Sequence, residues 1–238
     1  MIKKIVYSSL NLLACSLSFA GAMGSLVATD YQPKEDLYAG VGFGGRFSRN
    51  TETVTALESK NSTQTTVNAN QVVGNVYIGF GHTWFDNYFL GIEANTYFPG
   101  YSTDIKTRGV SQSNINTNNF YTNRFTYSDY LGLDLLPGWR FNPRSLIYLR
   151  TGLSFRAIEV SQNATITPNS LAYYNSGYTV GGRFGAGVAH GITKNIGVAV
   201  DYFYTYYPRW GSYWSTYNLQ QDIKSYQNYV GISLIYTS

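Results

Sequence analysis

Apolar residues alternate with small or polar residues along most of this chain, from Leu37 to its end. The first such segment sets Leu37, Ala39, Val41 and Phe43 against Tyr38, Gly40, Gly42 and Gly44. A period of two residues is typical of a β-strand with one apolar face. The pattern occurs eight times, near residues 37–47, 71–81, 90–98, 125–140, 147–156, 180–188, 196–205 and 227–236. These lengths are close to the about 9–11 residues that a tilted membrane strand requires.

The connections between these segments alternate in length. Short connections at residues 86–87, 142–145 and 193–195 consist of turn-forming residues such as Asn, Asp and Pro. Long polar connections follow at residues 49–70, 99–124, 161–177 and 208–224. Short turns on one side and long loops on the other are typical of outer-membrane barrels, whose loops are extracellular and whose termini are periplasmic.

The two faces of the segments differ in charge. One face is apolar and nearly free of charge in its middle, whereas the other carries Gly, Ser, Asn and the ionisable residues. A soluble barrel such as a lipocalin has its apolar side chains inside, because their burial drives folding in water. Here glycine on the other face leaves space for long charged side chains in the narrow interior of eight strands. We therefore predict an all-β fold, an eight-stranded antiparallel up-and-down transmembrane β-barrel with its apolar face toward lipid.

The composition also indicates a membrane location. Charged residues make up 13% of the chain, about half the usual share of a soluble domain, and aromatic residues 17%. The aromatic residues gather at both ends of the segments, as two belts at the two membrane surfaces would. Those beside the short turns are Trp84, Phe85, Tyr88, Trp139 and Phe141, and those toward the long connections are Phe47, Phe98, Phe125, Tyr127, Tyr204 and Tyr206.

Two other classes of protein are excluded. After residue 30 no stretch approaches the about 20 apolar residues of a membrane helix, which excludes a helical membrane protein. The 17 basic residues are scattered rather than clustered, so nucleic acid is not expected as a partner.

The N-terminus has the features of a secretory signal peptide. Lys3 and Lys4 precede an apolar stretch that small residues follow. We predict a signal peptide at residues 1–22, a short periplasmic segment at 23–35, and at 36–238 the barrel with four long extracellular loops. Cys15, the only cysteine, is then lost with the signal peptide. A transmembrane anchor and a lipid-modified Cys15 are the alternatives.

These features resemble the small outer-membrane β-barrels of the OmpA/OmpX/Opa type in Gram-negative bacteria. The resemblance covers about residues 36–238 and is carried by the eight strands, the turns at 84–93 and 191–198, and the final strand at 229–232. It implies an outer-membrane location, membrane lipid and lipopolysaccharide as partners, and an interior charge network that in some members is proposed as a gate. Such patterns specify the fold rather than the activity. Members often end on an aromatic residue used for insertion, whereas this chain ends on Ser238.

Six charged residues fall on the inward face and are expected to meet in the lumen: Arg46, Glu93, Asp134, Arg150, Arg183 and Asp201. Because unpaired charge away from water is costly, we expect salt bridges, in particular Asp134 with Arg150 and Arg183 with Asp201. A structural plug is the favoured interpretation, and an ion path is the alternative.

No catalytic, metal or cofactor site is predicted. His82 and His190 both lie beside short turns, far from the long connections in which a surface enzyme would need a general base. The fourth long connection is instead rich in aromatic residues, which supply contact area at a small entropic cost. Its candidates for recognition of a host or surface protein or glycan are Tyr207, Trp210, Tyr213, Trp214 and Tyr217. The alternative is that these rings only extend the outer aromatic belt.

The leading functional hypothesis is therefore an integral outer-membrane protein with a structural and surface-interaction role of the adhesin type, not an enzyme, with a plugged lumen. A small or gated pore is the first alternative. A lipid-modifying enzyme comes last, because no nucleophile and base are found together.

Overall fold

The computed structural model describes residues 32–238 apart from 58–59, 109–119, 167–168, 194 and 215–218. The predicted signal peptide with Cys15, and residues 23–31 of the predicted periplasmic segment, lie outside the described residues. The described part belongs to one compact unit, Tyr31–Ser238. None of its residues forms a helix that is long and apolar enough to cross a membrane.

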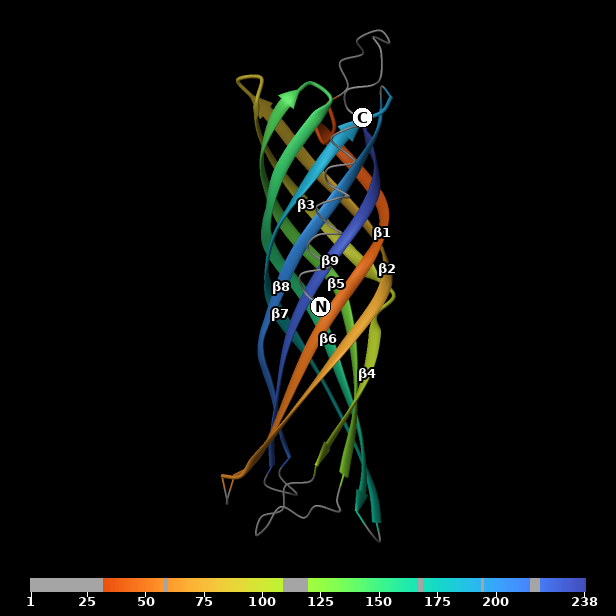
Figure 1. Ribbon diagram of the computed structural model, residues 1–238, viewed down its shortest axis with the longest axis vertical. Helices are drawn as coiled ribbons and strands as arrows, with labels where there is room; N and C mark the ends of the chain where they lie inside the picture. The colour runs from red at the N-terminus through yellow and green to blue at the C-terminus, as the bar shows by residue number, and fades with distance from the viewer. Residues whose placement is uncertain (1–31, 58–59, 109–119, 167–168, 194, 215–218) are drawn as a thin grey trace, which may run out of the picture. The chain divides into compact units, whose positions relative to one another are not determined.

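The unit is an antiparallel sheet closed into a ring (Figure 1). Its strands are β1 (Asp36–Ala56), β2 (Ser62–Trp84), β3 (Tyr88–Phe98), β4 (Tyr101–Arg108), β5 (Phe120–Asn142), β6 (Ser145–Ile166), β7 (Asn169–Gly191), β8 (Ile196–Trp214) and β9 (Leu219–Thr237). Consecutive strands pair with each other except β3 and β4, and β1 pairs with β9. β3 and β4 lie one after the other along β5, separated by Pro99 and Gly100. The ring thus has eight strand positions, and the predicted fold class is confirmed.

The short turns and the C-terminus lie at one end of the ring, which we call the short-turn end. Phe85 and Asp86 form the β2–β3 turn with φ angles of 50° and 65°, a left-handed conformation that so short a connection requires. At the same end the backbone N–H of Ser238 donates to the carbonyl of Leu37, at 3.1 Å. The opposite end carries the β1–β2, β4–β5, β6–β7 and β8–β9 connections and is called the loop end.

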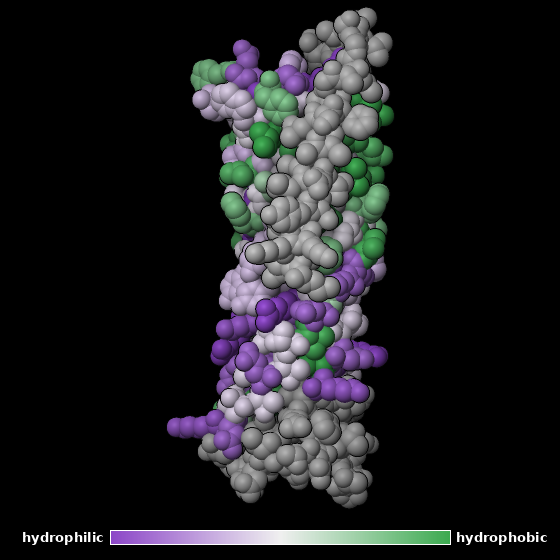
Figure 2. Space-filling model, in the orientation of Figure 1, coloured by the Kyte–Doolittle hydropathy of each residue, from purple (hydrophilic) through white to green (hydrophobic). Residues whose placement is uncertain are grey.

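The outer surface has an apolar belt, as the alternation predicts. Large apolar side chains are exposed along the strands next to the short-turn end, among them Val41, Phe43, Ile78, Phe80, Leu90, Ile92, Leu149, Leu153, Phe184, Ile232 and Leu234. Figure 2 shows this apolar surface in green, with hydrophilic purple surface nearer the loop end. So large an apolar surface is unfavourable in water and is typical of the lipid-facing band of a membrane barrel.

The strands continue far beyond the belt at the loop end. β1 reaches Ala56 and β2 begins at Ser62, so that most of residues 49–70 is strand. The described residues of the other three expected long loops are also mostly strand. The expectation of long loops is therefore corrected: most of the described residues of these segments belong to long hairpins. An apolar alternation does not reveal them, because outward side chains such as Gln64, Thr66 and Asn68 are polar where no lipid is present.

We call these outer parts of the strands the loop-end extension; it comprises residues 48–56, 62–73, 101–108, 120–129, 157–166, 169–178, 207–214 and 219–226. The β2–β3 ladder ends at Gly74–Phe98 and the β7–β8 ladder at Gly182–Tyr206. Beyond these pairs the extension consists of two four-stranded sheets, β8-β9-β1-β2 and β4-β5-β6-β7. Apolar side chains of both sheets pack between them: Tyr101, Ile105, Phe125, Tyr127, Ile158, Val160 and Ile223, flanked by Val67, Ala69 and Trp210.

Two β-bulges change which side chains point inward. The register shifts between Asp129 and Leu131 in β5, and between Tyr207 and Trp210 in β8. An extra residue reverses the alternation beyond the bulge. Phe125 and Tyr127, expected in the outer belt, are therefore buried between the sheets.

Candidate functional site

The lumen holds a charge cluster centred on Arg150. The Arg150 guanidinium lies 2.7 Å from Glu93, 2.6 Å from Asp134 and 3.2 Å from Asp201. Arg183 also contacts Asp134, at 2.9 Å. The expected Asp134–Arg150 pair is therefore present. Arg183 shares Asp134 instead of pairing with Asp201, whose carboxylate accepts from the Tyr148 hydroxyl as well, at 2.7 Å.

Strand register explains why these side chains meet. Glu93 of β3 lies directly opposite Asp134 of β5, which places two carboxylates side by side. Like charges in such a pair repel, so cations from β6 and β7 are needed to neutralise them. Glycine provides the space: a Cβ atom on Gly132 would come within 2.7 Å of the Arg183 guanidinium. The side chains of the cluster are buried and joined by hydrogen bonds, so they fill this level of the lumen.

Lys34 enters the same cluster from the N-terminal side. Its ammonium lies 2.6 Å from Glu93 and 4.6–5.1 Å from the ring centres of Tyr38, Tyr77 and Tyr148, and its side chain is fully buried. Arg140 donates to the Pro33 carbonyl at 2.8 Å. Residues 33–35 thus cover the short-turn end of the lumen. The sequence pattern misses Lys34 because it precedes the first alternating segment.

A second charge cluster lies toward the loop end. Asp129 accepts from Arg46 and Arg156, both at 2.6 Å, and from the Tyr207 hydroxyl at 3.0 Å. The Arg156 guanidinium also lies 3.6 Å from the centre of the Tyr207 ring, a cation–π contact. Arg46, expected in one network with Arg150, belongs to this separate cluster. Asp129 escapes prediction because it sits at the β5 bulge.

Aromatic rings separate the two charge clusters. Phe203 stacks on Tyr229 at a centroid distance of 4.7 Å, and both touch Tyr97. The Arg183 guanidinium lies 4.4 Å from the Phe203 ring centre. Charged, aromatic and charged layers therefore follow one another along the lumen, and the apolar core of the loop-end extension comes next.

The described members of the candidate recognition set, Tyr207, Trp210 and Tyr213, do not form one surface. Tyr207 points into the lumen, and Trp210 packs against the apolar core between the two sheets. Tyr213 is exposed, with 56% of its surface accessible. The side chain of Trp214 and all of Tyr217 lie outside the described residues. The β8 bulge explains the split, because it reverses the inward and outward positions.

The outer surface of the loop-end extension is largely polar and carries isolated charges. Arg124 contacts Asp104 at 2.9 Å, and both side chains are exposed. The hydrogen bond from Arg124 lowers the pKa of Asp104 below its usual value. This pair is present above the ordinary pKa of an aspartate and weakens as the pH falls below it.

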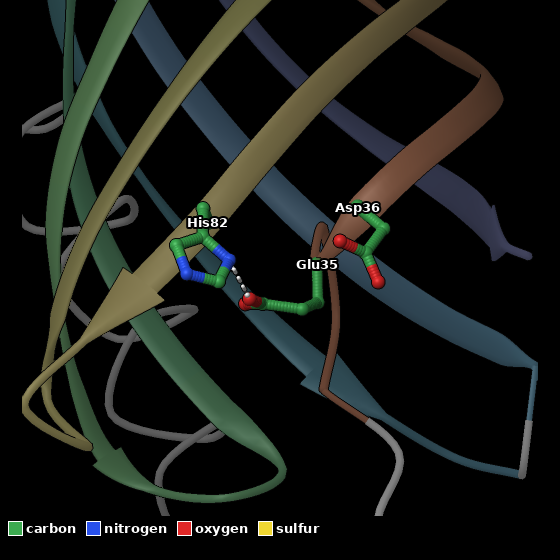
Figure 3. A group of neighbouring side chains, drawn as sticks. All are labelled: Glu35, Asp36 and His82. Carbon is green, nitrogen blue, oxygen red and sulfur yellow. Dashed lines mark ion pairs between the residues drawn. The ribbon is translucent and has the colours of Figure 1, made fainter.

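His82 lies at the short-turn end beside Glu35 and Asp36 (Figure 3). Figure 3 shows the imidazole and the Glu35 carboxylate facing each other; His82 Nδ1 lies 3.0 Å from Glu35 Oε1. Such a group has the donor types of a metal site. Glu35, however, also accepts from Thr83 at 2.6 Å and from Arg140 at 3.0 Å. Its carboxylate thus anchors the N-terminal segment rather than offering vacant ligand positions.

His190 forms a hydrogen bond with Ser145, 2.9 Å from Nδ1 to Oγ. A serine beside a histidine is the first requirement of a nucleophilic pair. The two residues are direct cross-strand partners of β6 and β7, and Ser145 is buried. A buried hydroxyl cannot reach a substrate, so the contact is structural.

An antiparallel ring with an apolar belt and a filled, charged interior defines an integral β-barrel membrane protein. Residues 12–235 match the family model of the outer membrane protein beta-barrel domain, and the chain belongs to this family. It is located in the outer membrane of a Gram-negative bacterium. No curated protein sequence matches the chain.

Several solved barrels are similar to the chain. The outer membrane protease OmpT of Escherichia coli is 12% identical, with a TM-score of 0.55 over 90% of this chain and 99% of that protein. Ail, the attachment invasion locus protein of Yersinia pestis, is 13% identical, with a TM-score of 0.40 over 84% of this chain and 99% of Ail. Neisserial surface protein A is 12% identical, with a TM-score of 0.34 over 80% of this chain and 95% of that protein. At these identities the likeness concerns the fold alone.

Proposed function

We propose that this barrel has a structural and surface-interaction role of the adhesin type, and that it is neither an enzyme nor an open channel. The observation that carries the proposal is the loop-end extension, whose two sheets enclose their own apolar core beyond the lipid-facing belt. A membrane anchor alone needs no such core. A rigid, polar, protruding platform suits the presentation of a binding surface, because little entropy is lost when a preformed surface binds.

Two exposed tyrosines mark the surface that we favour for recognition. Tyr174 of β7 and Tyr213 of β8 flank the seam where the β7–β8 ladder has ended, and their exposed fractions are 64% and 56%. Asn175 donates to Ser212 across the same seam, at 2.6 Å, which holds the two strands together. Exposed tyrosines on rigid strands are effective contacts for a protein or glycan. This pair keeps Tyr213 from the set that the sequence indicated and adds Tyr174.

Replacement of both tyrosines by serine tests this role. We expect cells that display Tyr174→Ser/Tyr213→Ser to bind host epithelial cells or a glycan array about tenfold less than wild type, since exposed tyrosines often dominate interfaces. Tyr178→Ser is the matched control, an exposed tyrosine of β7 that contacts Tyr130 beside the belt. Folding is checked by the heat-dependent gel mobility of a closed barrel. Unchanged binding by the folded double variant would contradict the proposed surface.

A gated pore is the second candidate, favoured by the ionisable groups of the lumen. The successive layers argue against conduction, because each spans the interior with buried, mutually bonded side chains. We expect the wild-type barrel to be silent in planar lipid bilayers over a wide voltage range. Discrete conductance steps that change when Arg150→Gln and Asp134→Asn are combined would favour the pore instead.

An enzyme is the least supported reading. Among the described residues of the loop-end extension there is no histidine to act as a general base. The similarity to the protease OmpT concerns the fold alone.

A further inference from the structure

The large outward side chains of β1 and β9 change in kind along each strand toward the loop end. They are apolar at first, then aromatic and finally cationic. On β1 they run from Val41 through Phe43 and Phe47 to Arg49, and on β9 from Ile232 and Val230, with Asn228 between, through Tyr226 to Lys224. Lipid chains, the membrane surface and water favour these kinds of side chain in the same order. Arg49 and Lys224 therefore lie where the lipid-facing belt ends and lipid headgroups begin.

Arg49 and Lys224 are diagonal neighbours on these two paired strands. Arg49 lies directly opposite Tyr226, and Lys224 lies two residues beyond Tyr226 in β9. Diagonal neighbours of an antiparallel pair are about 7–8 Å apart, so two long side chains can reach the same anionic group. Among the described residues neither cation has a hydrogen-bond or ion-pair partner. Both charges are therefore available to an external anion.

Two other cations of the loop-end extension already have acidic partners. Arg124 pairs with Asp104 at 2.9 Å, and Arg209 pairs with Asp222 at 3.2 Å. Asp222 lies two residues before Lys224 in β9, and its pairing with Arg209 leaves the charge of Lys224 uncompensated. A positively charged spot therefore remains on the outer surface of β1 and β9.

Three tyrosine rings continue this surface onto β8. Tyr226 lies directly opposite Arg49 on one side and opposite Tyr206 on the other. Its ring centre is 5.5 Å from that of Tyr206 and 6.4 Å from that of Tyr204. Tyrosines are favoured at membrane surfaces, because the ring is apolar and the hydroxyl is polar. Together the cations and the rings offer positive charge to a phosphate and a ring face to a sugar.

A similar aromatic cluster on the side formed by β5, β6 and β7 is followed by an acid instead. There Tyr130 contacts Phe155 and Tyr178. The next charged outward residue of β6 toward the loop end is Glu159, which is exposed. A carboxylate repels an anionic headgroup, so anionic lipid should gather at β1 and β9 rather than evenly around the barrel.

We propose that Arg49, Lys224 and these three tyrosines bind the phosphorylated sugar headgroup of lipid A, the membrane anchor of lipopolysaccharide. The Arg49 guanidinium can donate two parallel hydrogen bonds to a phosphate, and the Lys224 ammonium adds a point charge. The tyrosine rings contact the sugar, and the acyl chains extend along the apolar belt. This inference does not depend on the proposed recognition surface at Tyr174 and Tyr213.

Binding of lipid A with and without its phosphates tests the proposal. The barrel in nonionic detergent is titrated with diphosphorylated or with dephosphorylated lipid A, and native mass spectrometry measures the fraction of the protein that carries a lipid. We expect saturable binding of the diphosphorylated form and binding of the dephosphorylated form that is weaker by about tenfold or more, because basic residues attract anionic lipid. Equal binding of the two forms would overturn the proposal.

The double variant Arg49→Gln/Lys224→Gln removes both charges and breaks no hydrogen bond or ion pair of the described residues. It should weaken the binding of diphosphorylated lipid A about tenfold or more and leave the binding of the dephosphorylated form unchanged. Lys60→Gln/Lys106→Gln is the matched control, because it removes two other exposed cations on the loop-end side of the belt. This control should bind like wild type. An equal loss in both double variants would contradict the site, since only net charge would then matter.

A stability measurement protects the test against misfolding. Heat-dependent gel mobility shows whether each variant is a closed barrel. Diphosphorylated lipid A should raise the unfolding temperature of wild type more than that of Arg49→Gln/Lys224→Gln, because a ligand that binds only the folded state stabilises that state. An equal rise for the two proteins would contradict the site independently of the mass spectrometry.

Discussion

Replacement of Arg150 by methionine is expected to lower the free energy of unfolding by about 3–5 kcal/mol, the usual cost of removing one partner from a buried ion pair. Arg150 is the cation common to Glu93, Asp134 and Asp201. Without it Glu93 retains Lys34 and Asp134 retains Arg183. Among the described residues Asp201 then has no other salt-bridge partner, and the hydrogen bond from the Tyr148 hydroxyl is what remains to stabilise its charge inside the barrel.

The measurement is the urea concentration at which half of the refolded barrel in detergent is unfolded. The folded fraction is determined from the gel mobility of unboiled samples. Arg124→Met is the matched control, because Arg124 pairs with Asp104 at 2.9 Å and both side chains are exposed. Exposed pairs contribute about 0–1 kcal/mol, so this control should stay close to wild type. Adding Asp201→Asn to Arg150→Met should restore part of the loss. Equal midpoints for the Arg150 and Arg124 variants would contradict the central role of the Arg150 cluster.

Gly185→Ala, which adds a single methyl group, is expected to lower the free energy of unfolding by about 1–3 kcal/mol through overpacking. A Cβ atom there would lie 2.1 Å from the Tyr202 carbonyl oxygen and 2.5 Å from the Phe203 Cβ, contacts that the backbone must move to relieve. Phe203 is the direct partner of Gly185 across the β7–β8 ladder. Because Phe203 also stacks on Tyr229, the displacement reaches the aromatic layer of the lumen.

Gly182→Ala is the control for this substitution, three positions earlier in the same strand. A Cβ atom at Gly182 would meet nothing within 4 Å. Alanine is favoured over glycine in a strand, by about 0.5–1 kcal/mol, so Gly182→Ala should match or exceed wild type in its urea midpoint. Equal urea midpoints for the two alanine variants would contradict the prediction, because they would mean that the close approach of β7 and β8 does not require glycine at position 185.

The alternation of side chains was sufficient to predict the membrane part of the fold. Lipid outside and a narrow polar interior impose opposite requirements on successive residues, so each spanning strand carries a period of two that is visible in the sequence alone. The same alternation placed Glu93, Asp134, Arg150, Arg183 and Asp201 on the inner face, where they lie. The sequence also indicated why glycine is frequent on the inner face, because the narrow interior has little space beside the long charged side chains.

The alternation of apolar and polar side chains did not predict the strands of the loop-end extension. In water a strand needs no apolar outer face, so outward residues such as Thr66 and Asn68 read as loop although they lie in β2. The two bulges had the same effect on a smaller scale. One extra residue near Asp129, and another between Tyr207 and Trp210, exchanged inward and outward positions; the first moved Phe125 and Tyr127 inside, and the second turned Tyr213 outward.

The sequence by itself therefore determined the eight-position barrel, its lipid-facing surface and the charged character of its lumen, because these follow from a local periodicity. The partners within the lumen were decided only by the tertiary structure. Arg183 pairs with Asp134 and not with Asp201, and Lys34, which precedes the first strand, pairs with Glu93. Both pairings depend on the strand register and on the closure of the barrel, which bring together residues that are distant in the sequence. Arg49 and Lys224 become neighbours for the same reason, since they belong to the first and last strands, which meet only when the barrel closes.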